Sequence, residues 1–167
     1  TQDTSSAASD VYKRQPLTIA DKNANEIILN RLNLLTPDIP IISEETFEVE
    51  SLQSLSKTYW LVDPLDGTKE FINKTGEFTV NIALINDRST IFGIVAAPVS
   101  GKIWHGSIFS KQPIVDPAPK NIRIVMSKSH KNENDEKFLE FLDMNEVQYQ
   151  IVEKGSSLKL CSLADNE

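Results

Sequence analysis

Two aspartates three residues apart are the side chains most able to do chemistry in this sequence. Asp63 and Asp66 lie in the segment 63–68, of sequence Asp-Pro-Leu-Asp-Gly-Thr, directly after a short apolar run. A carboxylate at a strand end, a tight turn and a second carboxylate would form an oxygen-rich pocket for hard cations, with the Leu65 carbonyl between them. Gly67 lets the backbone approach a ligand closely, and free amides at a helix start suit a phosphate. The segment therefore predicts a site for magnesium and phosphate.

The same segment also has a simpler structural interpretation. Asp66 could cap the helix that follows it, and Asp63 could merely end a strand. For an isolated turn of this kind that interpretation is the better one, because such turns are common. Here the pattern extends over Trp60–Phe71. That stretch resembles the signature of the inositol monophosphatase superfamily, in which an apolar strand is followed by Asp-Pro-x-Asp-Gly-Thr and a later Phe.

The resemblance extends beyond this signature. Segment 16–21, Pro-Leu-Thr-Ile-Ala-Asp, is similar to the family's N-terminal element, and segment 41–45, Ile-Ile-Ser-Glu-Glu, is similar to its Glu-Glu element. Both stand in the family's order. Segment 76–84, Gly-Glu-Phe-Thr-Val-Asn-Ile-Ala-Leu, is similar too. The likeness thus covers the chain from about residue 16 to its end.

Within the superfamily, four segments resemble the bacterial 3'(2'),5'-bisphosphate nucleotidases more than the inositol phosphatases. Two of them are 68–71, Thr-Lys-Glu-Phe, and 76–78, Gly-Glu-Phe. The other two are 127–130, Ser-Lys-Ser-His, and 155–159, Gly-Ser-Ser-Leu-Lys. The resemblance therefore implies a doubly phosphorylated nucleotide as the small-molecule partner.

The resemblance also implies a set of metal ligands. Glu44 and Asp63 would be shared ligands, the Leu65 carbonyl would complete the first site, and Asp66 would serve the second. The cofactor would be Mg²⁺, as two or three ions, and the family is characteristically sensitive to lithium, which competes for a magnesium site.

Further roles are implied around these ligands. Thr68 would orient the attacking water, supported by a hydrogen bond with Asp21. The amides of Gly67 and Thr68 would hold the scissile phosphate. Four residues are similar to positions that contact the nucleotide and its other phosphate: Ser127, His130, Ser156 and Lys159.

The implied reaction is Mg²⁺-dependent removal of the 3'-phosphate from adenosine 3',5'-bisphosphate, which gives AMP and recycles a by-product of sulfate assimilation. Phosphate monoesters hydrolyse extremely slowly without a catalyst, so the site must lower a very large barrier. Magnesium can lower the pKa of a bound water, polarise the phosphoryl oxygens and neutralise the leaving alkoxide. Glu44 is the natural acceptor for the water's proton, directly or through Thr68.

Several of these residues have plain alternatives. Glu44 and Glu45 could form a solvated acidic pair, although beside the signature we expect Glu44 to be a ligand and Glu45 to support it from outside the ligand set. Asp21 could cap the following helix, a role that is compatible with a place in the site. His130 could be a surface or capping residue, and Lys159 a solvated helix residue.

Two alternative functions also stay open. The nearest is an inositol or sugar-phosphate phosphatase with the same chemistry and a different leaving group. The other is a catalytically incompetent module that binds a nucleotide or a metal ion without turnover.

Composition fits a soluble globular protein. Of the 167 residues, 40% are hydrophobic and 25% charged. The formal net charge of −7 speaks against a nucleic-acid polymer as partner but not against a small phosphorylated substrate beside a metal ion. Cys161 is the single cysteine, which favours a reducing cytoplasm, and no apolar run has the length of a transmembrane segment. Whether the protein forms a homodimer or rests on the cytoplasmic face of the inner membrane stays open.

Hydrophobic periodicity predicts the elements that position these residues. We expect Trp104 and His105 to be structural strand residues and Cys161 to be a small buried hydrophobe. The helix over 132–144 should turn Phe138, Leu139 and Leu142 inward. The expected helices are 25–35, 132–144 and one that begins in 156–163; the expected strands are 59–62, an antiparallel meander of 78–86, 90–98 and 102–108, then 122–126 and 147–152.

The fold class implied by the resemblance is α+β, a layered αβαβα sandwich of the inositol-monophosphatase and fructose-bisphosphatase type. Residues 1–15 are expected to be disordered or a foreign leader, 16–118 the metal-binding half, and 119–167 the start of a C-terminal α/β half. Family members continue further and carry a Trp-Asp-x-Ala-Ala-Gly motif whose Asp is a metal ligand, and this sequence contains no such motif. We therefore expect a truncated chain with a weakened second magnesium site, active only when completed.

Overall fold

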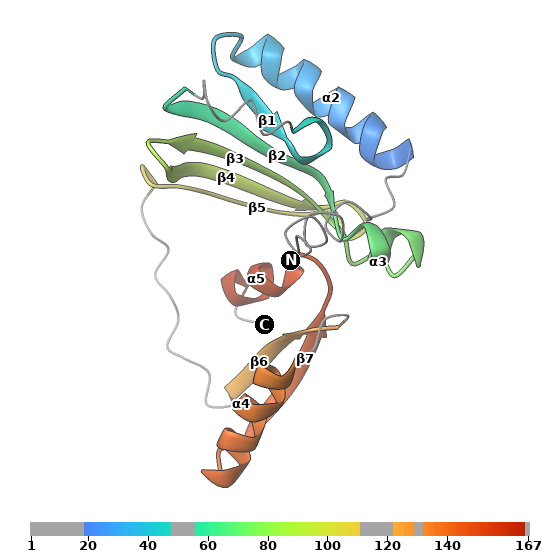
Figure 1. Ribbon diagram of the computed structural model, residues 1–167, viewed down its shortest axis with the longest axis vertical. Coiled ribbons are helices and arrows are strands. Elements are labelled where there is room, and N and C mark those ends of the chain that lie inside the picture. Colours follow the sequence, from blue (N-terminus) through green and yellow to red (C-terminus); the bar gives the residue numbers. More distant parts are fainter. Residues whose placement is uncertain (1–18, 48–55, 111–121, 129–131, 166–167) are drawn as a thin grey trace, which may run out of the picture.

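The computed structural model describes residues 19–47, 56–110, 122–128 and 132–165 (Figure 1). Within these ranges the strands form two separate sheets, and helices accompany both. The elements in chain order are α2 (Ile19–Leu35), β1 (Ile41–Ser43), the 3₁₀ helix η1 (Glu44–Thr46), β2 (Thr58–Asp66), α3 (Thr68–Ile72), β3 (Thr79–Asn86), β4 (Ser89–Ala97), β5 (Lys102–Ser107), β6 (Ile122–Ser127), α4 (Glu133–Met144), β7 (Tyr149–Lys154) and α5 (Leu158–Ala164).

The first sheet has five strands in the order β1-β2-β3-β4-β5. β1 pairs in parallel with β2, and the remaining neighbours are antiparallel, which confirms the predicted meander. Asp87 and Arg88 join β3 to β4 with φ angles of 46° and 66°, as the tight hairpin turns that match strand twist require. α2 lies along one face of this sheet, where Leu32 packs against Trp60 and Val62.

Strand β2 runs further than its sequence predicts. Pro64 and Gly67 after Val62 indicated a strand end, but pairing with β3 continues to Asp66 opposite Thr79. The register shifts between Asp63 and Asp66, so Pro64 lies in a β-bulge, one of the few places where a sheet tolerates proline. The bulge keeps both aspartates on the strand and changes the direction of the chain between them.

The second sheet consists of β6 and β7, which pair in parallel and are joined by α4. Asn132 begins α4 with a capping box, in which its side chain accepts from the Asp135 amide and the Asp135 carboxylate accepts from the Asn132 amide. The prediction that Phe138 faces inward is wrong, because 51% of its surface is exposed. A sheet of two strands is too narrow to cover the whole apolar stripe of the helix.

Helix α2 begins six residues earlier than predicted, at Ile19 rather than Asn25. Asp21 is therefore not the N-cap. It lies inside the first turn, where its negative charge complements the helix dipole. The predicted leader at residues 1–15 and the predicted domain boundary at residue 118 lie outside the described residues. No described helix is both long enough and apolar enough to cross a membrane.

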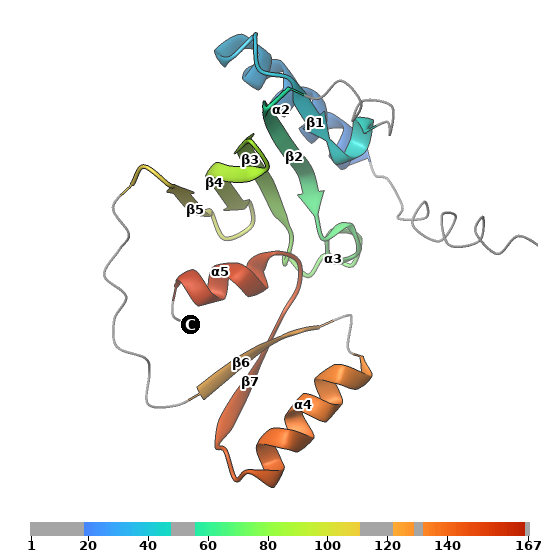
Figure 2. The same cartoon turned by 60° about the vertical axis from the view of Figure 1, so that its left-hand side comes forward.

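Helix α5 lies between the two sheets in both views of the chain (Figures 1 and 2). It follows β7 directly, so the turn before it, at residues 155–157, reaches from the second sheet toward the end of β2 in the first sheet. Cys161 on this helix is 5% exposed, which confirms the predicted buried position.

Candidate functional site

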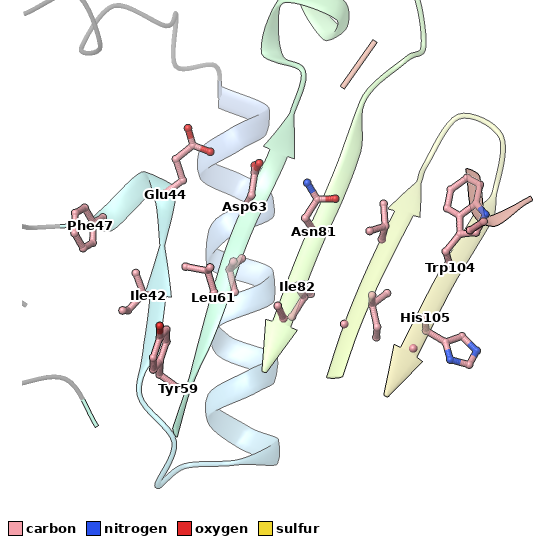
Figure 3. A pocket seen from close by; sticks show the side chains of 17 residues that line it. Ile42, Glu44, Phe47, Tyr59, Leu61, Asp63, Asn81, Ile82, Trp104 and His105 are labelled. Atoms are coloured by element: carbon pink, nitrogen blue, oxygen red, sulfur yellow. The ribbon is translucent and has the colours of Figure 1, made fainter. Parts of the chain in front are cut away.

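Glu44 and Asp63 form a close carboxylate pair at one end of the first sheet. Ser43 and Val62 are register partners on the parallel strands β1 and β2, so the residues that follow them emerge at the same edge. Figure 3 shows both carboxylates at the end of the cavity on this face. Burial, then the negative charges of Glu44 and Asp66, raise the pKa of Asp63 to about 7.

The negative charges of this pair repel each other, and a hard cation between them would remove that repulsion. Burial and the charges of Glu44 and Asp66 favour a proton on Asp63 at neutral pH. A divalent cation could replace that proton, and carboxylate oxygens are the donors that Mg²⁺ and Ca²⁺ prefer. Among the residues that the structure describes, no group of three or more His, Cys, Asp and Glu side chains converges into a metal site. The pair is therefore the part of the predicted ligand set that the fold brings together.

Two further acidic residues lie next to the pair. Asp21 is only 1% exposed on α2, and burial, then the charges of Asp21 and Glu44, raise the pKa of Glu45. The hydroxyl of Ser43 donates to the Asn25 side chain at 2.6 Å, which ties α2 to the end of β1 just before Glu44. Helix α2 thus places a buried carboxylate near Glu45.

The bulged turn after Asp63 is held by its own hydrogen bonds. The Leu65 amide donates to Asp63 Oδ1 at 3.1 Å, and the Thr68 hydroxyl donates to the Leu65 carbonyl at 3.4 Å. Because Thr68 directs its hydroxyl at Leu65, the hydrogen bond with Asp21 that the resemblance implies stays a prediction. Gly67 has a φ of 94°, a left-handed conformation that favours glycine, and no side chain caps α3 after it. The capping role considered for Asp66 is therefore wrong.

The carboxylate of Asp66 contacts the second sheet's turn instead. Its Oδ2 accepts hydrogen bonds from Ser156 Oγ at 2.5 Å, the Ser157 amide at 2.6 Å and Thr79 Oγ1 at 3.3 Å. Gly67 takes part in the same contact, because a Cβ on it would lie 3.0 Å from the Ser156 Cβ. Ser156, predicted to bind substrate, thus lies directly against Asp66, which was predicted to bind metal.

The other predicted substrate-binding residues are less fully placed. Lys159 Nζ donates to the Ser156 carbonyl at 2.8 Å, so its ammonium lies at the same turn. Ser127 ends β6 and is the register partner of Lys154. His130 lies outside the described residues.

Sequence reasoning missed two residues that hold this turn in place. Glu77 Oε2 accepts from the Gly155 amide at 3.2 Å and pairs with Lys128 Nζ at 3.4 Å, so it contacts both predicted substrate-binding segments. Thr79 contacts Ser156 and Ser157 as well as Asp66. Both belong to segment 76–84, whose family resemblance was the available signal, although it assigned them no role.

A cavity of about 840 Å³ extends from the carboxylate pair across the face of the first sheet that α2 leaves open (Figure 3). Most of its lining is apolar, and Trp104 and His105 lie at its other side. The Trp104 indole donates to Asp165 Oδ1 at 2.7 Å, next to the Lys102–Asp165 ion pair, which agrees with a structural role for this tryptophan.

The sequence was compared with known families and proteins. A family model described as the inositol monophosphatase family matches residues 2–167. The 3'(2'),5'-bisphosphate nucleotidase CysQ of Salmonella typhimurium is 40% identical over 160 residues, and CysQ of Escherichia coli strain K12 is 39% identical. Each match covers 91% of this chain and 63% of the relative, so the chain spans less than two thirds of their length.

Solved structures agree with this family. A crystal structure of CysQ from Bacteroides thetaiotaomicron, described as a bacterial member of the inositol monophosphatase family, is 30% identical with a TM-score of 0.77. The match covers 91% of this chain and 65% of that one. The suppressor protein suhB of Bartonella henselae has a TM-score of 0.72 at 23% identity, which shows the shared fold. The layered α+β fold is thereby confirmed, and the chain belongs to the inositol monophosphatase family.

Proposed function

We propose that this chain carries the metal-binding half of a phosphomonoester hydrolase that removes the 3'-phosphate of adenosine 3',5'-bisphosphate and leaves AMP. The observation that carries the proposal is the Glu44–Asp63 pair beside the Asp-Pro-Leu-Asp-Gly-Thr turn. The relatives at 39–40% identity, which are 3'(2'),5'-bisphosphate nucleotidases by name, support the choice of substrate. The single Cys161 supports a cytoplasmic place of action.

The metal would be held first by Glu44 and Asp63, with the Leu65 carbonyl as a third oxygen. A bound Mg²⁺ would supply positive charge to the phosphoryl oxygens and lower the pKa of a water. Asp66 would serve a further ion, and two or three ions complete the proposal. Because Oδ2 of Asp66 already accepts from Ser156 Oγ and the Ser157 amide and lies 3.3 Å from Thr79 Oγ1, that ion would bind through Oδ1 or displace the Ser156–Ser157 turn.

The remaining steps use residues of the same turn. Glu44 would accept the proton of the attacking water, directly or through Thr68. Thr68, buried at the start of α3, would orient that water, and Asp21 would support it from α2. The backbone amides of Gly67 and Thr68 would bind the scissile phosphate, which the left-handed glycine allows to approach closely.

The nucleotide would lie toward the second sheet. Ser156 and Lys159 are at the turn that contacts Asp66, so a hydroxyl and an ammonium lie next to the proposed phosphate site. A phosphate needs such donors, and a second phosphate on the same substrate would use the ammonium. Ser127 at the end of β6, followed by Lys128 and His130, would complete the contacts.

The test uses the chain completed with a C-terminal segment that carries the Trp-Asp-x-Ala-Ala-Gly motif. It measures phosphate release with Mg²⁺ from adenosine 3',5'-bisphosphate and, side by side, from inositol 1-phosphate. We expect release from the nucleotide, lost in Glu44→Gln and kept in Glu140→Gln, a matched change on the exposed face of α4. Preference for inositol 1-phosphate would keep the metal chemistry and overturn the substrate. Release from neither would contradict the proposed activity of this chain and favour a non-catalytic module, which calorimetry with the same nucleotide would then detect.

A further inference from the structure

Thr79 is the most deeply buried polar side chain at the contact between the two sheets, with 0% of its surface exposed. It begins β3 and lies opposite Asp66 across the β-bulge. Its hydroxyl oxygen is 2.8 Å from Ser156 Oγ, 2.6 Å from Ser157 Oγ and 3.3 Å from Asp66 Oδ2. One hydroxyl thus joins the first sheet, the bulged turn and the turn before α5.

Hydrogen counting shows what this hydroxyl contributes. Each hydroxyl carries a single hydrogen and accepts up to two. Ser156 uses its hydrogen on Asp66 Oδ2, so the single Thr79 hydrogen can go to Ser156 or to Asp66. The single Ser157 hydrogen can go to Thr79 or to Asn81 Oδ1, which lies 3.1 Å away. The result is a chain of hydroxyls that ends on a carboxylate, an arrangement in which each bond polarises and strengthens the next. A valine at position 79 would fill the same space and break this chain at its centre.

The backbone of the turn fits closely around this chain. A Cβ on Gly155 would lie 2.8 Å from the Glu70 Cγ and 3.2 Å from the Glu77 backbone oxygen, and the Gly155 amide donates to the Glu77 side chain. The turn is therefore seated on the first sheet from Gly155 to Ser157. Thr79 is the buried side chain that contacts both serine hydroxyls in this turn.

We propose that Thr79 is a positioning residue, which fixes the turn 155–157 against Asp66 and thereby sets where Ser156 and Lys159 meet the nucleotide. The position of the turn 155–157 follows from the hydrogen bonds alone, whereas the effect of Thr79 on nucleotide binding rests on the proposed function. Thr79 itself need not touch the substrate, because it acts through the two serines.

The experiment compares four single variants of the full chain and one double variant, Thr79→Val with Ser157→Ala, by amide hydrogen exchange and by calorimetric titration with adenosine 3',5'-bisphosphate. Thr79→Val removes the hydroxyl and keeps the shape, and Thr79→Ser keeps the hydroxyl. Thr90→Val is the same change at an exposed position on β4 and serves as the matched control. Ser157→Ala removes the Thr79 contact from the turn's side and covers the case in which Thr79→Val does not fold.

We expect the Ser157 amide, which donates to Asp66, to exchange about tenfold faster in Thr79→Val, the size of one lost net hydrogen bond. Exchange within β3 and β4 should not change, Thr79→Ser should restore the slow rate, and Thr90→Val should have no effect. Ser157→Ala should accelerate hydrogen exchange at the Gly155 amide. In the double variant Thr79→Val with Ser157→Ala, the loss of protection should be smaller than the sum of the two single losses, because both changes remove the same contact.

The outcomes separate this inference from the proposed function. Unchanged exchange at residues 155–157 in both Thr79→Val and Ser157→Ala would overturn the positioning role. Faster exchange together with several-fold weaker nucleotide binding would support both. Faster exchange with nucleotide affinity unchanged would overturn the consequence for the substrate. Faster exchange in a chain whose native form does not bind the nucleotide would overturn the proposed function and leave the seating of the turn established.

Discussion

Asp63 and Asp66 lie three residues apart on one bulged strand, yet their carboxylates have opposite surroundings. Asp63 faces Glu44, and burial together with neighbouring negative charge raises its pKa to about 7. Asp66 faces three hydrogen-bond donors from Thr79 and the turn 156–157. The bulge, by turning the chain between them, lets one motif serve two purposes. Among the described residues, the charges that act on Asp63 are negative, as at a cation site before its ion binds, whereas Asp66 joins the second sheet to the first through hydrogen bonds.

The largest change in stability is expected from replacing Asp66, the aspartate that joins the two sheets. Asp66→Ala leaves buried donors without their acceptor, which should lower the free energy of unfolding by about 2–3 kcal/mol. Urea denaturation would measure this, with Asp38→Ala at an exposed position as the control. If both variants lost the same stability, Asp66 would not fasten the sheets.

Replacing Asp63 is expected to stabilise the chain, in contrast to replacing Asp66. Asp63→Asn removes the charge that Glu44 repels and keeps an acceptor for the Leu65 amide, so without metal it should raise the free energy of unfolding at pH 8. The shift of the pKa from 3.8 to about 7 sets an upper bound, and solvent screening reduces the gain to about 1–2 kcal/mol. The same denaturation assay applies, and a loss of stability in this variant would contradict the repulsion.

The pH dependence should show the same repulsion. The pKa of Asp63 is higher in the folded chain than in the unfolded chain, so the folded chain binds its proton more tightly. Its contribution to stability is therefore present below about pH 4 and is lost as pH rises to about 7. The gain from Asp63→Asn should accordingly vanish at pH 4. Denaturation curves at pH 4, 6 and 8 for both proteins would check this, and a gain that persists at pH 4 would argue against it.

The smallest change in stability is expected at Asp165, which makes a second contact between the C-terminal region and the first sheet. Asp165 pairs with Lys102 at 2.9 Å and accepts from the Trp104 indole, and these hydrogen bonds lower the pKa of its carboxyl group. Because this contact is exposed, Asp165→Asn should cost at most about 0.5 kcal/mol, less still at high salt. If Asp165→Asn lowered the free energy of unfolding as much as Asp66→Ala, the buried turn would not be the main contact between the C-terminal region and the first sheet.

Periodicity and turn residues predicted the elements well where each depends on its own sequence. The meander, the α4 helix and the burial of Cys161 follow from local pattern and are confirmed. The bulge was missed because Pro64 reads as a strand end, and only pairing with β3 shows that the strand continues. Phe138 was misplaced because the width of the sheet behind α4 is not a local property.

The candidate site was predictable in its acidic part and not in its contacts. The family resemblance indicated Glu44 and Asp63, and the parallel pairing of β1 and β2 places them together. The role of Thr79 depends on serines 77 and 78 residues away, a contact that no spacing rule indicates. Asp66 was expected among the metal ligands, whereas its strongest contacts are with a turn 90 residues later in the sequence.

The most direct test of the cation site is a ¹³C NMR titration of the Asp63 side-chain carboxyl with and without Mg²⁺, using Asp63→Asn to assign the signal. We expect a pKa near 7 without Mg²⁺, because Glu44 and burial favour the protonated form. With saturating Mg²⁺ the carboxyl should stay ionised down to about pH 5, since a bound cation favours the charged form. An ordinary aspartate pKa near 4 that does not respond to Mg²⁺ would contradict the account.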